Sequence, residues 1–265
     1  MNRKTVTTLH KMKADREKIA AITAYDASLA HVCEMAGVDL LLVGDSLAMV
    51  VQGHENTLPV TVDEMVYHTA CVSRASRQAL LVADMPFMAY ATTDRALETA
   101  ERLMKQGGAQ MVKLEGGVPQ LETVRYLSER GIPVCGHLGL TPQSVHRLGG
   151  YRVQGRDQAA ARAMLEESAA LQQAGAQLLV LECVPGTLAN EISRNLEIPV
   201  IGIGAGPDTD GQVLVLYDVL GISVNRIPKF ARDFMREAKS VEAAVRAYVE
   251  AVRRGDFPGP EHSFE

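Results

Sequence analysis

The chain has 265 residues, of which 47% are hydrophobic and 22% are charged, with a formal net charge of −5 at pH 7. These proportions are ordinary for a folded globular protein and exclude disorder as a global description. A net negative charge, no Trp and only 5% aromatic residues leave neither a basic field nor a stacking surface for nucleic acid.

The N-terminal residues and the cysteines indicate a cytoplasmic protein. Residues 1–18 lack the apolar stretch of a signal peptide, and no apolar run approaches the ~20 residues of a membrane span. Cys33, Cys71, Cys135 and Cys183 lie far apart without a Cys-x-x-Cys pair. This spacing disfavours a disulfide framework or a zinc site and fits a reducing compartment. We interpret all four cysteines as small buried hydrophobic residues.

Eight short apolar segments follow one another along the chain, and each is typical of a strand buried on both faces of a parallel sheet. They begin near residues 19, 39, 79, 110, 133, 177, 199 and 213. Their average spacing is about 28 residues, close to the ~30 residues per unit of a (β/α)8 barrel.

Amphipathic segments between the strands predict the helices of such a barrel. The clearest cover residues 93–106 and 157–173, and residues 241–254 predict a C-terminal helix. We expect the tail from residue 258 to 265, which begins with a Pro-Gly-Pro sequence, to be irregular. The sequence therefore predicts one domain over residues 1–265, a single TIM-type barrel, with a doubly wound open sheet as the alternative.

Polar residues end five consecutive predicted strands. Asp45, Asp84, Glu115, His137 and Glu182 each follow an apolar run. In a barrel, these strand ends build the active site. A single acid there can also be a helix N-cap. Four acids at one mouth, however, repel one another unless a cation or a positive substrate neutralises them.

Three of these carboxylates predict a metal site. Without cysteine ligands, Asp45, Asp84 and Glu115 favour a hard cation. Mg²⁺ fits best because it accepts a few carboxylates, directly or through water, and leaves room for substrate oxygens. Zn²⁺ bound with His137 is the weaker alternative.

Two further residues are candidates for holding a substrate. Lys113 lies two positions before Glu115, so both side chains face the barrel interior. The amine of Lys113 is either a Schiff-base nucleophile or a counter-charge for a substrate carboxylate, and the neighbouring acids favour the counter-charge. Ser46 either hydrogen-bonds the same ligand or caps the loop that follows.

Glu182 and His137 are candidates for proton transfer and substrate binding. Glu182 follows an apolar strand, and a partly desolvated carboxylate there suits a general base. The alternative is a capped loop carboxylate. His137 either hydrogen-bonds an enolate or carboxylate of the substrate, or satisfies a backbone group.

At these residues the sequence resembles the ketopantoate hydroxymethyltransferases of pantothenate biosynthesis. The matching stretches run through the whole chain in order: Thr23-Ala24-Tyr25-Asp26, Val43-Gly44-Asp45-Ser46-Leu47, Gln52-Gly53-His54, Thr57-Leu58-Pro59-Val60-Thr61, Ala83-Asp84-Met85-Pro86-Phe87, Val112-Lys113-Leu114-Glu115-Gly116-Gly117, Gly136-His137-Leu138-Gly139-Leu140-Thr141-Pro142-Gln143, Leu181-Glu182-Cys183-Val184-Pro185 and Gly202-Ile203-Gly204-Ala205-Gly206. Each motif alone is weakly specific, but together they are highly specific.

The resemblance implies a Mg²⁺-dependent barrel of the phosphoenolpyruvate mutase-like superfamily. It implies transfer of a hydroxymethyl group from 5,10-methylenetetrahydrofolate to 3-methyl-2-oxobutanoate, which yields 2-dehydropantoate by metal-assisted enolisation and C–C bond formation. It also implies a cytosolic homo-oligomer, typically a decamer of two stacked pentamers.

The resemblance also implies roles for individual residues. Asp45, Asp84 and Glu115 match the metal positions of the family, and Asp45, Asp84, Ser46 and Lys113 match positions around the keto acid. His137 matches a histidine on the substrate side, and Glu182 matches the proposed base.

Two positions depart from the family pattern. Ala48 stands where glycine is expected after Asp-Ser-Leu, and Tyr217 stands where histidine is common before Asp218. Both departures bear on loop detail and on the folate side rather than on the metal set.

Two other functions remain as alternatives at this point. One is a metal-dependent C–C lyase or mutase of the same superfamily that acts on a pyruvate-type acid without folate. The other is a non-catalytic binding or assembly protein, which the converging acids disfavour.

Overall fold

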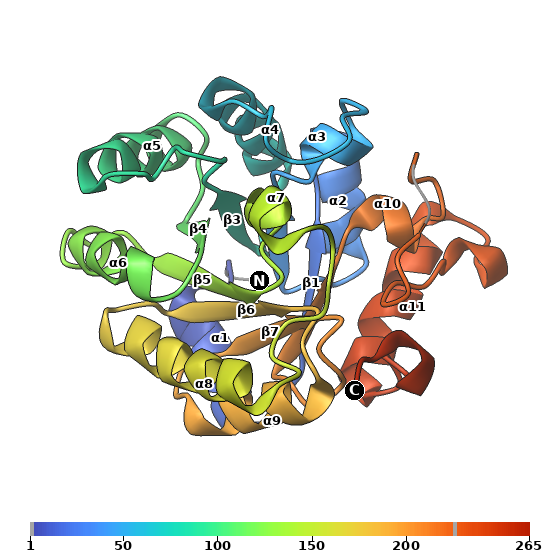
Figure 1. The fold of residues 1–265 in the computed structure, drawn as a ribbon. Coiled ribbons are helices and arrows are strands. Elements are labelled where there is room, and N and C mark those ends of the chain that lie inside the picture. Colours follow the sequence, from blue (N-terminus) through green and yellow to red (C-terminus); the bar gives the residue numbers. More distant parts are fainter. Residues whose placement is uncertain (1–2, 225–226) are drawn as a thin grey trace.

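Eight parallel strands close into a barrel in the computed structural model, which describes residues 3–224 and 227–265 (Figure 1). Along the barrel the strands keep their chain order: β1 (Ile19–Thr23), β2 (Leu40–Val43), β3 (Leu80–Asp84), β4 (Met111–Glu115), β5 (Val134–Gly139), β6 (Leu178–Glu182), β7 (Val200–Ile203) and β8 (Gly211–Leu214). β1 pairs with β8 from Ile19↔Gly211 to Ile22↔Leu214, which closes the barrel. The predicted barrel is confirmed, and an open sheet is excluded.

The strands begin close to their predicted positions, with the largest shift at the eighth strand. β8 begins at Gly211, two residues before the predicted start, because Gly211 pairs with both Ile19 and Ile201. It ends at Leu214. The amide of Leu216 then donates to the Thr23 hydroxyl at 2.9 Å, as the chain turns into a short helix.

Helices surround the barrel (Figure 1). They are α1 (Val6–Ala14), α2 (Ala27–Met35), α3 (Leu47–Val50), α4 (Val62–Ala75), α5 (Thr93–Lys105), α6 (Leu121–Ser128), α7 (Val145–Leu148), α8 (Gln158–Gln173), α9 (Gly186–Asn195), α10 (Leu216–Val219) and α11 (Val241–Arg254), with 3-10 turns η1 (Val118–Gln120), η2 (Pro142–Ser144), η3 (Met235–Glu237) and η4 (Pro260–His262). The predicted helix at 157–173 begins one residue later because Asp157 is its N-cap and accepts from the amide of Ala160. None of the described helices is long and apolar enough to cross a membrane.

The C-terminal helix α11 covers the seam where the barrel closes. It spans the predicted residues, with Val245, Tyr248 and Val252 buried and Val241 half-buried. The buried hydroxyl of Tyr248 donates to the carbonyl of Ala21 in β1 at 2.8 Å and lies 3.0 Å from that of Gln212 in β8. One side chain therefore fixes this helix to both strands of the seam.

The C-terminal tail is more ordered than the sequence suggests. Residues 260–262 form the turn η4, and the carbonyl of Phe264 accepts from the amide of Gly186 at 3.0 Å. Lys229 also donates to the carbonyl of Ser263 at 2.9 Å. The expectation of an irregular tail was wrong in this respect, because contacts with distant parts of the chain hold the tail.

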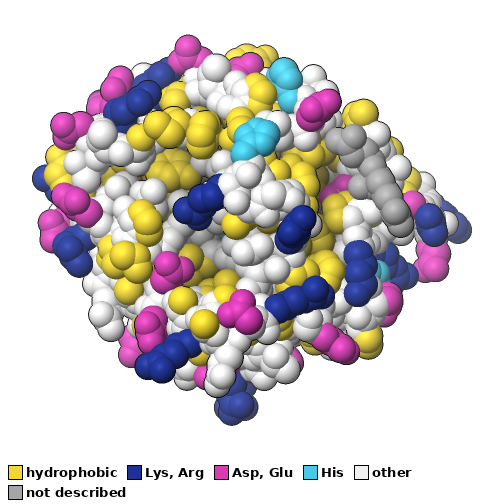
Figure 2. Space-filling model, in the orientation of Figure 1, with side chains coloured by type: hydrophobic (Ala, Val, Ile, Leu, Met, Phe, Trp, Pro, Cys, Tyr) yellow, Lys and Arg dark blue, Asp and Glu magenta, His cyan; other side chains and the backbone are white. Residues whose placement is uncertain are grey.

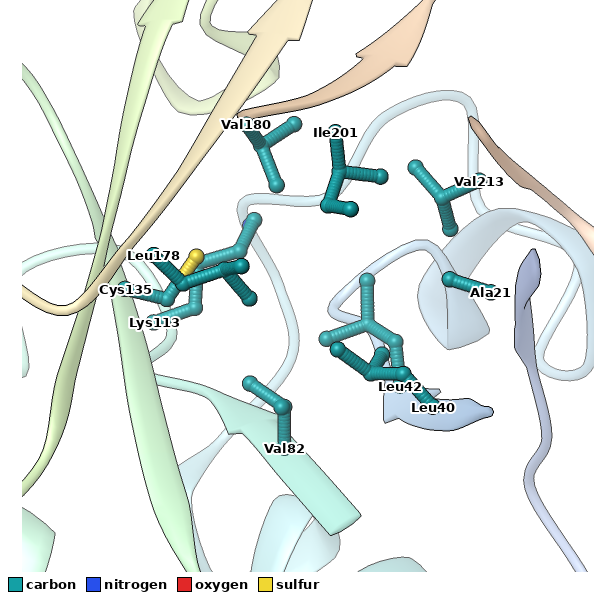
Figure 3. Close-up of a pocket in the computed structure, with 10 residues that line it drawn as sticks. All are labelled: Ala21, Leu40, Leu42, Val82, Lys113, Cys135, Leu178, Val180, Ile201 and Val213. Carbon is teal, nitrogen blue, oxygen red and sulfur yellow. The ribbon is translucent and has the colours of Figure 1, made fainter. Parts of the chain in front are cut away.

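The middle of the barrel is filled by apolar side chains (Figure 3). Around a void of about 10 Å³ lie Ala21, Leu40, Leu42, Val82, Lys113, Cys135, Leu178, Val180, Ile201 and Val213. A void of this size holds at most one water, and its apolar lining offers that water few partners. Since side chains alternate along a strand, the residues two positions further along β3, β4, β5 and β6 form the next layer towards the carboxyl ends.

The cysteines largely follow the prediction. All four are free thiols, and Cys33, Cys135 and Cys183 are buried. Cys71 is only half-buried, because it lies on α4, an outer helix with few buried positions. For Cys71 the prediction of a buried residue was wrong.

Candidate active site

The predicted acids gather at the carboxyl ends of the strands. Asp84, Glu115 and Glu182 are the last residues of β3, β4 and β6, and Asp45 lies two residues beyond β2. His137 was predicted at a strand end, but β5 continues to Gly139. His137 pairs in register with Glu115, so it still reaches the layer of the carboxylates.

Lys113 and Asp84 form a buried ion pair in adjacent strands. They pair in register, and the Lys113 Nζ lies 2.6 Å from the Asp84 Oδ1, with both side chains about 5% exposed or less. Burial lowers the pKa of Lys113, but the negative charges of Asp84, Glu115 and Asp45 outweigh it and raise that pKa above its ordinary value. The side chain is therefore an ammonium group.

Asp45 lies in an electrostatically unfavourable position. Burial, followed by the charges of Asp84 and Glu115, raises the pKa of Asp45 well above its ordinary range, although Lys113 and Gln143 oppose the shift. Its amide donates to the Asp84 Oδ2 at 3.1 Å, which holds the two acids close together. The three carboxylates of this cluster therefore need more positive charge than Lys113 supplies.

Sequence reasoning missed two residues that organise these carboxylates, Gln143 and Tyr90. Gln143 lies in the turn η2. Its side-chain Nε2 donates to the Asp45 Oδ2 at 2.9 Å, and its backbone N–H donates to the Glu115 Oε2 at 3.0 Å. The Tyr90 hydroxyl donates to the Gln143 Oε1 at 2.5 Å, which fixes the orientation of the side-chain amide. Thr141-Pro142-Gln143 belongs to the matched motifs, but no role was assigned to it.

His137 lies between two carboxylates from neighbouring strands. Its Nδ1 is 3.4 Å from the Glu115 Oε1, and its Nε2 is 3.3 Å from the Glu182 Oε2. Burial and the charge of Lys113 lower the pKa of His137. The interactions with Glu115 and Glu182 outweigh them, and the net result is a pKa of about 9. The two carboxylates therefore favour the protonated form of the imidazole.

Three buried atoms of this group have no aligned hydrogen-bond partner within the described part of the chain: the Glu115 Oε1 and both ring nitrogens of His137. Buried polar atoms are normally satisfied. Unsatisfied atoms that face one another at a barrel mouth indicate a place where a polar ligand completes the bonding.

Ser46, the residue after Asp45, is hydrogen-bonded to Tyr25. The hydroxyls of Ser46 and Tyr25 lie 2.9 Å apart, and Ser46 makes no side-chain cap to α3. The alternative of a capping serine is therefore wrong.

The two departures from the family pattern lie at Tyr217 and Ala48. The Tyr217 ring packs edge-on against that of Tyr25, with centroids 5.7 Å apart, so this departure lies behind Ser46. Ala48 is fully buried in α3.

The donor chemistry suits a hard cation, since Asp45, Asp84 and Glu115 offer only oxygen atoms. Their oxygens are partly engaged by protein donors, and no three His, Cys, Asp or Glu side chains within residues 3–224 and 227–265 are arranged to hold a metal ion by themselves. A cation that keeps several waters and takes only one or two carboxylates directly, as Mg²⁺ does, fits such a set.

Comparison with known proteins agrees with these features. The family model described as "Ketopantoate hydroxymethyltransferase" matches residues 3–260. The 3-methyl-2-oxobutanoate hydroxymethyltransferase of Halorhodospira halophila is 60% identical over 261 residues, which cover 98% of this chain and 94% of that protein. The enzyme of the same name from Shewanella amazonensis is 58% identical over 264 residues, which cover 100% of both chains.

Solved structures of low identity share the fold. The phosphoenolpyruvate phosphomutase of Streptomyces platensis subsp. rosaceus superposes with a TM-score of 0.61 at 14% identity, covering 82% of this chain and 83% of that chain. A 2,3-dimethylmalate lyase, a member of the PEP mutase/isocitrate lyase superfamily, gives a TM-score of 0.54 at 19% identity, covering 74% and 70%. These likenesses show that the chain shares the barrel fold of these structures.

Proposed function

The chain belongs to the ketopantoate hydroxymethyltransferase family, and on this premise we propose how its barrel mouth performs the reaction. The chain transfers a hydroxymethyl group to 3-methyl-2-oxobutanoate in pantothenate biosynthesis, and this activity implies 5,10-methylenetetrahydrofolate as co-substrate. Family membership decides against both alternatives, the folate-independent lyase or mutase and the non-catalytic protein. The observation that carries the mechanism is the buried ring of carboxylates around Lys113 and His137.

The acidic side of the site is proposed to hold Mg²⁺. Asp45, Asp84 and Glu115 would bind it, directly or through water. Two observations support this assignment: the Glu115 Oε1 makes no aligned hydrogen bond, and burial and the charges of Asp84 and Glu115 raise the pKa of Asp45. When bound, Mg²⁺ would withdraw electron density from the keto oxygen of the substrate and so favour loss of the C3 proton.

The carboxylate end of the keto acid is proposed to lie towards Lys113 and Ser46, beside Asp45 and Asp84. The 2.6 Å pair with Asp84 keeps Lys113 charged, which supports a counter-charge and disfavours a Schiff base, since that requires a neutral amine. A fixed carboxylate decides which face of C3 is presented to the donor.

Glu182 is proposed as the base. Its side chain is 13% exposed, at the edge of the buried cluster, and its Oε2 lies 3.3 Å from the His137 Nε2. The proton moves from C3 to the Glu182 carboxylate, while His137 holds that carboxylate in place on the substrate side. The enolate carbon then bonds to the one-carbon unit of the folate. The two C–N bonds that held this carbon to the folate break. Water supplies the hydroxyl group, and one proton of the water and the proton held by Glu182 pass to the two folate nitrogens, so that 2-dehydropantoate and tetrahydrofolate leave.

Assembly and location are proposed from the family resemblance. We infer a homo-oligomer, a decamer of two stacked pentamers, in the cytoplasm, with small molecules rather than nucleic acid or membrane as partners. Four free thiols suit a reducing compartment.

A calorimetric experiment tests the metal assignment. Titration of Mg²⁺ into the protein with 3-methyl-2-oxobutanoate should show metal-dependent binding, and the double variant Asp45→Ala with Asp84→Ala should abolish it, because two of the three oxygen donor groups are lost. Asp63→Ala, a change of an exposed acid on α4, is the matched control. Unchanged Mg²⁺ binding in the double variant would refute the assignment.

A further inference from the structure

The connection between β5 and α8 passes over the mouth of the barrel. In Figure 1, α7 and the chain that follows it lie in front of the strands. The connection is anchored at its start by Gln143, which is bonded to Asp45. Towards its end, the amide of Gln154 donates to the carbonyl of Cys183 at 2.9 Å, directly after Glu182. The residues between Gln143 and Gln154 therefore lie between Asp45, a proposed metal ligand, and Glu182, the proposed base.

Tyr151 is the aromatic residue of this span. Two glycines precede it, Gly149 with φ +68° and Gly150 with φ +110°, conformations that glycine adopts readily and that turn the chain sharply. The Tyr151 hydroxyl reaches to 3.6 Å from the Met49 Sδ on α3, in the loop that follows Asp45. The side chain therefore extends from the β5 loop to the β2 loop.

The contacts of Tyr151 within the fold do not account for a tyrosine at this position. Tyr151 is 52% exposed, and the one hydrogen-bonding contact of its side chain in the described chain is to a thioether, a weak acceptor. Burial and the charges of Glu182, Asp45 and Glu115 raise its pKa, which is consistent with a phenol close to the carboxylate ring. An exposed aromatic ring beside a catalytic cluster is suited to stack on a ligand.

Two arginines flank the tyrosine on the same connection. Arg147 and Arg152 are exposed, and neither makes an ion pair or a side-chain hydrogen bond with the described residues, whereas Arg162 and Arg246 pair with acids one helical turn away. Figure 2, in the same orientation, shows Lys and Arg side chains beside a hollow in this face. A free guanidinium group binds carboxylates through paired hydrogen bonds.

The second substrate has to arrive from this side. Below the carboxylate layer the barrel is filled by apolar side chains, with a void of only about 10 Å³. The folate donor carries its reactive methylene on a flat ring system at one end and glutamate carboxylates at the other. The donor therefore enters at the mouth of the barrel, over which the connection that carries Tyr151 passes.

We propose that Tyr151, Arg147 and Arg152 form the outer subsite for the one-carbon donor. The Tyr151 ring stacks on the ring system of the folate, and the two guanidinium groups bind its glutamate carboxylates. This assignment rests on the proposed function, because it places the donor against a keto acid held by the carboxylate ring. Tyr151 is a positioning residue: it aligns the donor and takes no part in proton transfer.

The test separates donor binding from enolisation. Exchange of the C3 proton in D₂O requires the keto acid but no donor, whereas product formation requires both. Tyr151→Ala should raise the calorimetric Kd for tetrahydrofolate and the KM for the donor about tenfold, the effect of losing one stacking contact, and leave the exchange rate within about twofold. Tyr151→Phe, which keeps the ring, should restore donor binding.

The arginines have a test of their own. Arg152→Ala should weaken binding of tetrahydrofolate but not of tetrahydropteroate, which lacks the glutamate. Tyr67→Ala, at a tyrosine 66% exposed on α4, and Arg125→Ala, at an exposed arginine on α6, are the matched controls.

Two results would overturn the proposed subsite. One is donor binding unchanged in Tyr151→Ala, and the other is exchange reduced as much as transfer, which would make the connection a general lid. Failure of exchange in the unaltered protein would contradict the proposed enolisation instead, and the tetrahydrofolate titrations would still decide the subsite.

Discussion

Gln143 illustrates how one neutral side chain organises a charged site. The Tyr90 hydroxyl occupies its oxygen, so its Nε2 can only be offered to the Asp45 carboxylate and to the carbonyl of Met85, at 2.9 and 3.0 Å. Gln143→Leu removes both donations and leaves the buried Tyr90 hydroxyl without its acceptor. An unsatisfied buried group costs about 1–3 kcal/mol.

We therefore expect Gln143→Leu to weaken Mg²⁺ binding in the presence of the keto acid about tenfold or more, because Asp45 loses its fixed orientation. Calorimetry measures the affinity. Gln158→Leu, at an exposed position on α8, should leave it unchanged. Equal Mg²⁺ affinity in Gln143→Leu and the unaltered protein would show that Asp45 needs no such support.

A single substitution, Glu182→Gln, tests the proposed base. The amide keeps the shape of the side chain but cannot accept a proton, so turnover should fall by about 10²-fold or more, while the calorimetric Kd for the keto acid changes little. A variant that turns over at the rate of the unaltered protein would remove Glu182 from the mechanism.

The positions of polar residues along the predicted strands indicated part of the candidate site. Asp84, Glu115 and Glu182 were found because each ends an apolar strand, and Lys113 because it is two residues from Glu115 on the same strand. Gln143 and Tyr90 lie on loops, and their bonds to Asp45 and Glu115 depend on how those loops fold over the mouth. Spacing along the chain carries no signal for such contacts.

Among the elements, α2 shows how a helix end is fixed to a strand. The Glu34 Oε1 near its C-terminus accepts from the amides of Arg77, Gln78 and Ala79 and from the Ser76 hydroxyl, at 2.7–2.8 Å. Although partial burial raises the pKa of Glu34, these bonds outweigh it and hold that pKa below its usual value of 4.5. The carboxylate thus binds the start of β3 to α2.

This arrangement predicts a pH-dependent contribution to stability. A depressed folded-state pKa stabilises the protein above pH 4.5, and the contribution is lost as the pH falls through the folded value. Glu34→Gln should lower the free energy of unfolding in urea by about 1 kcal/mol at pH 7, a modest amount because solvent screens a partly exposed carboxylate. The difference should shrink as the pH falls below 4.5.

The exposed Glu17→Gln serves as the control for Glu34→Gln and should show no such pH dependence. A difference between Glu34→Gln and the unaltered protein that stays constant as the pH falls through and below 4.5 would contradict the assignment.

The elements themselves were largely predictable. Short apolar runs at nearly constant spacing specify strands and barrel, and Val241–Arg254 was predicted with its observed bounds because its periodicity and its Ser240 cap are local. The early start of β8 and the ordered tail were missed. The pairing of Gly211 with Ile19 and the bond from Gly186 to Phe264 join segments that are far apart in sequence.

At the scale of the whole molecule, the proposed decamer gives a simple expectation. Ten copies of a 28.7 kDa chain should elute from size exclusion with a light-scattering mass of about 290 kDa, independent of concentration well above the Kd of assembly. A mass near that of one chain would exclude the decamer and leave the single-chain mechanism intact.

Enolisation within the carboxylate ring is the central claim, and proton NMR of 3-methyl-2-oxobutanoate in D₂O tests it most directly. With protein and Mg²⁺, the C3 proton signal should disappear, and a chelator should stop the loss. Glu182→Gln should prevent it as well. Exchange that persists in the chelator and yields a borohydride-trapped Lys113 would replace the metal mechanism by a Schiff base. No exchange under any of these conditions would contradict catalysis at this mouth through an enolate.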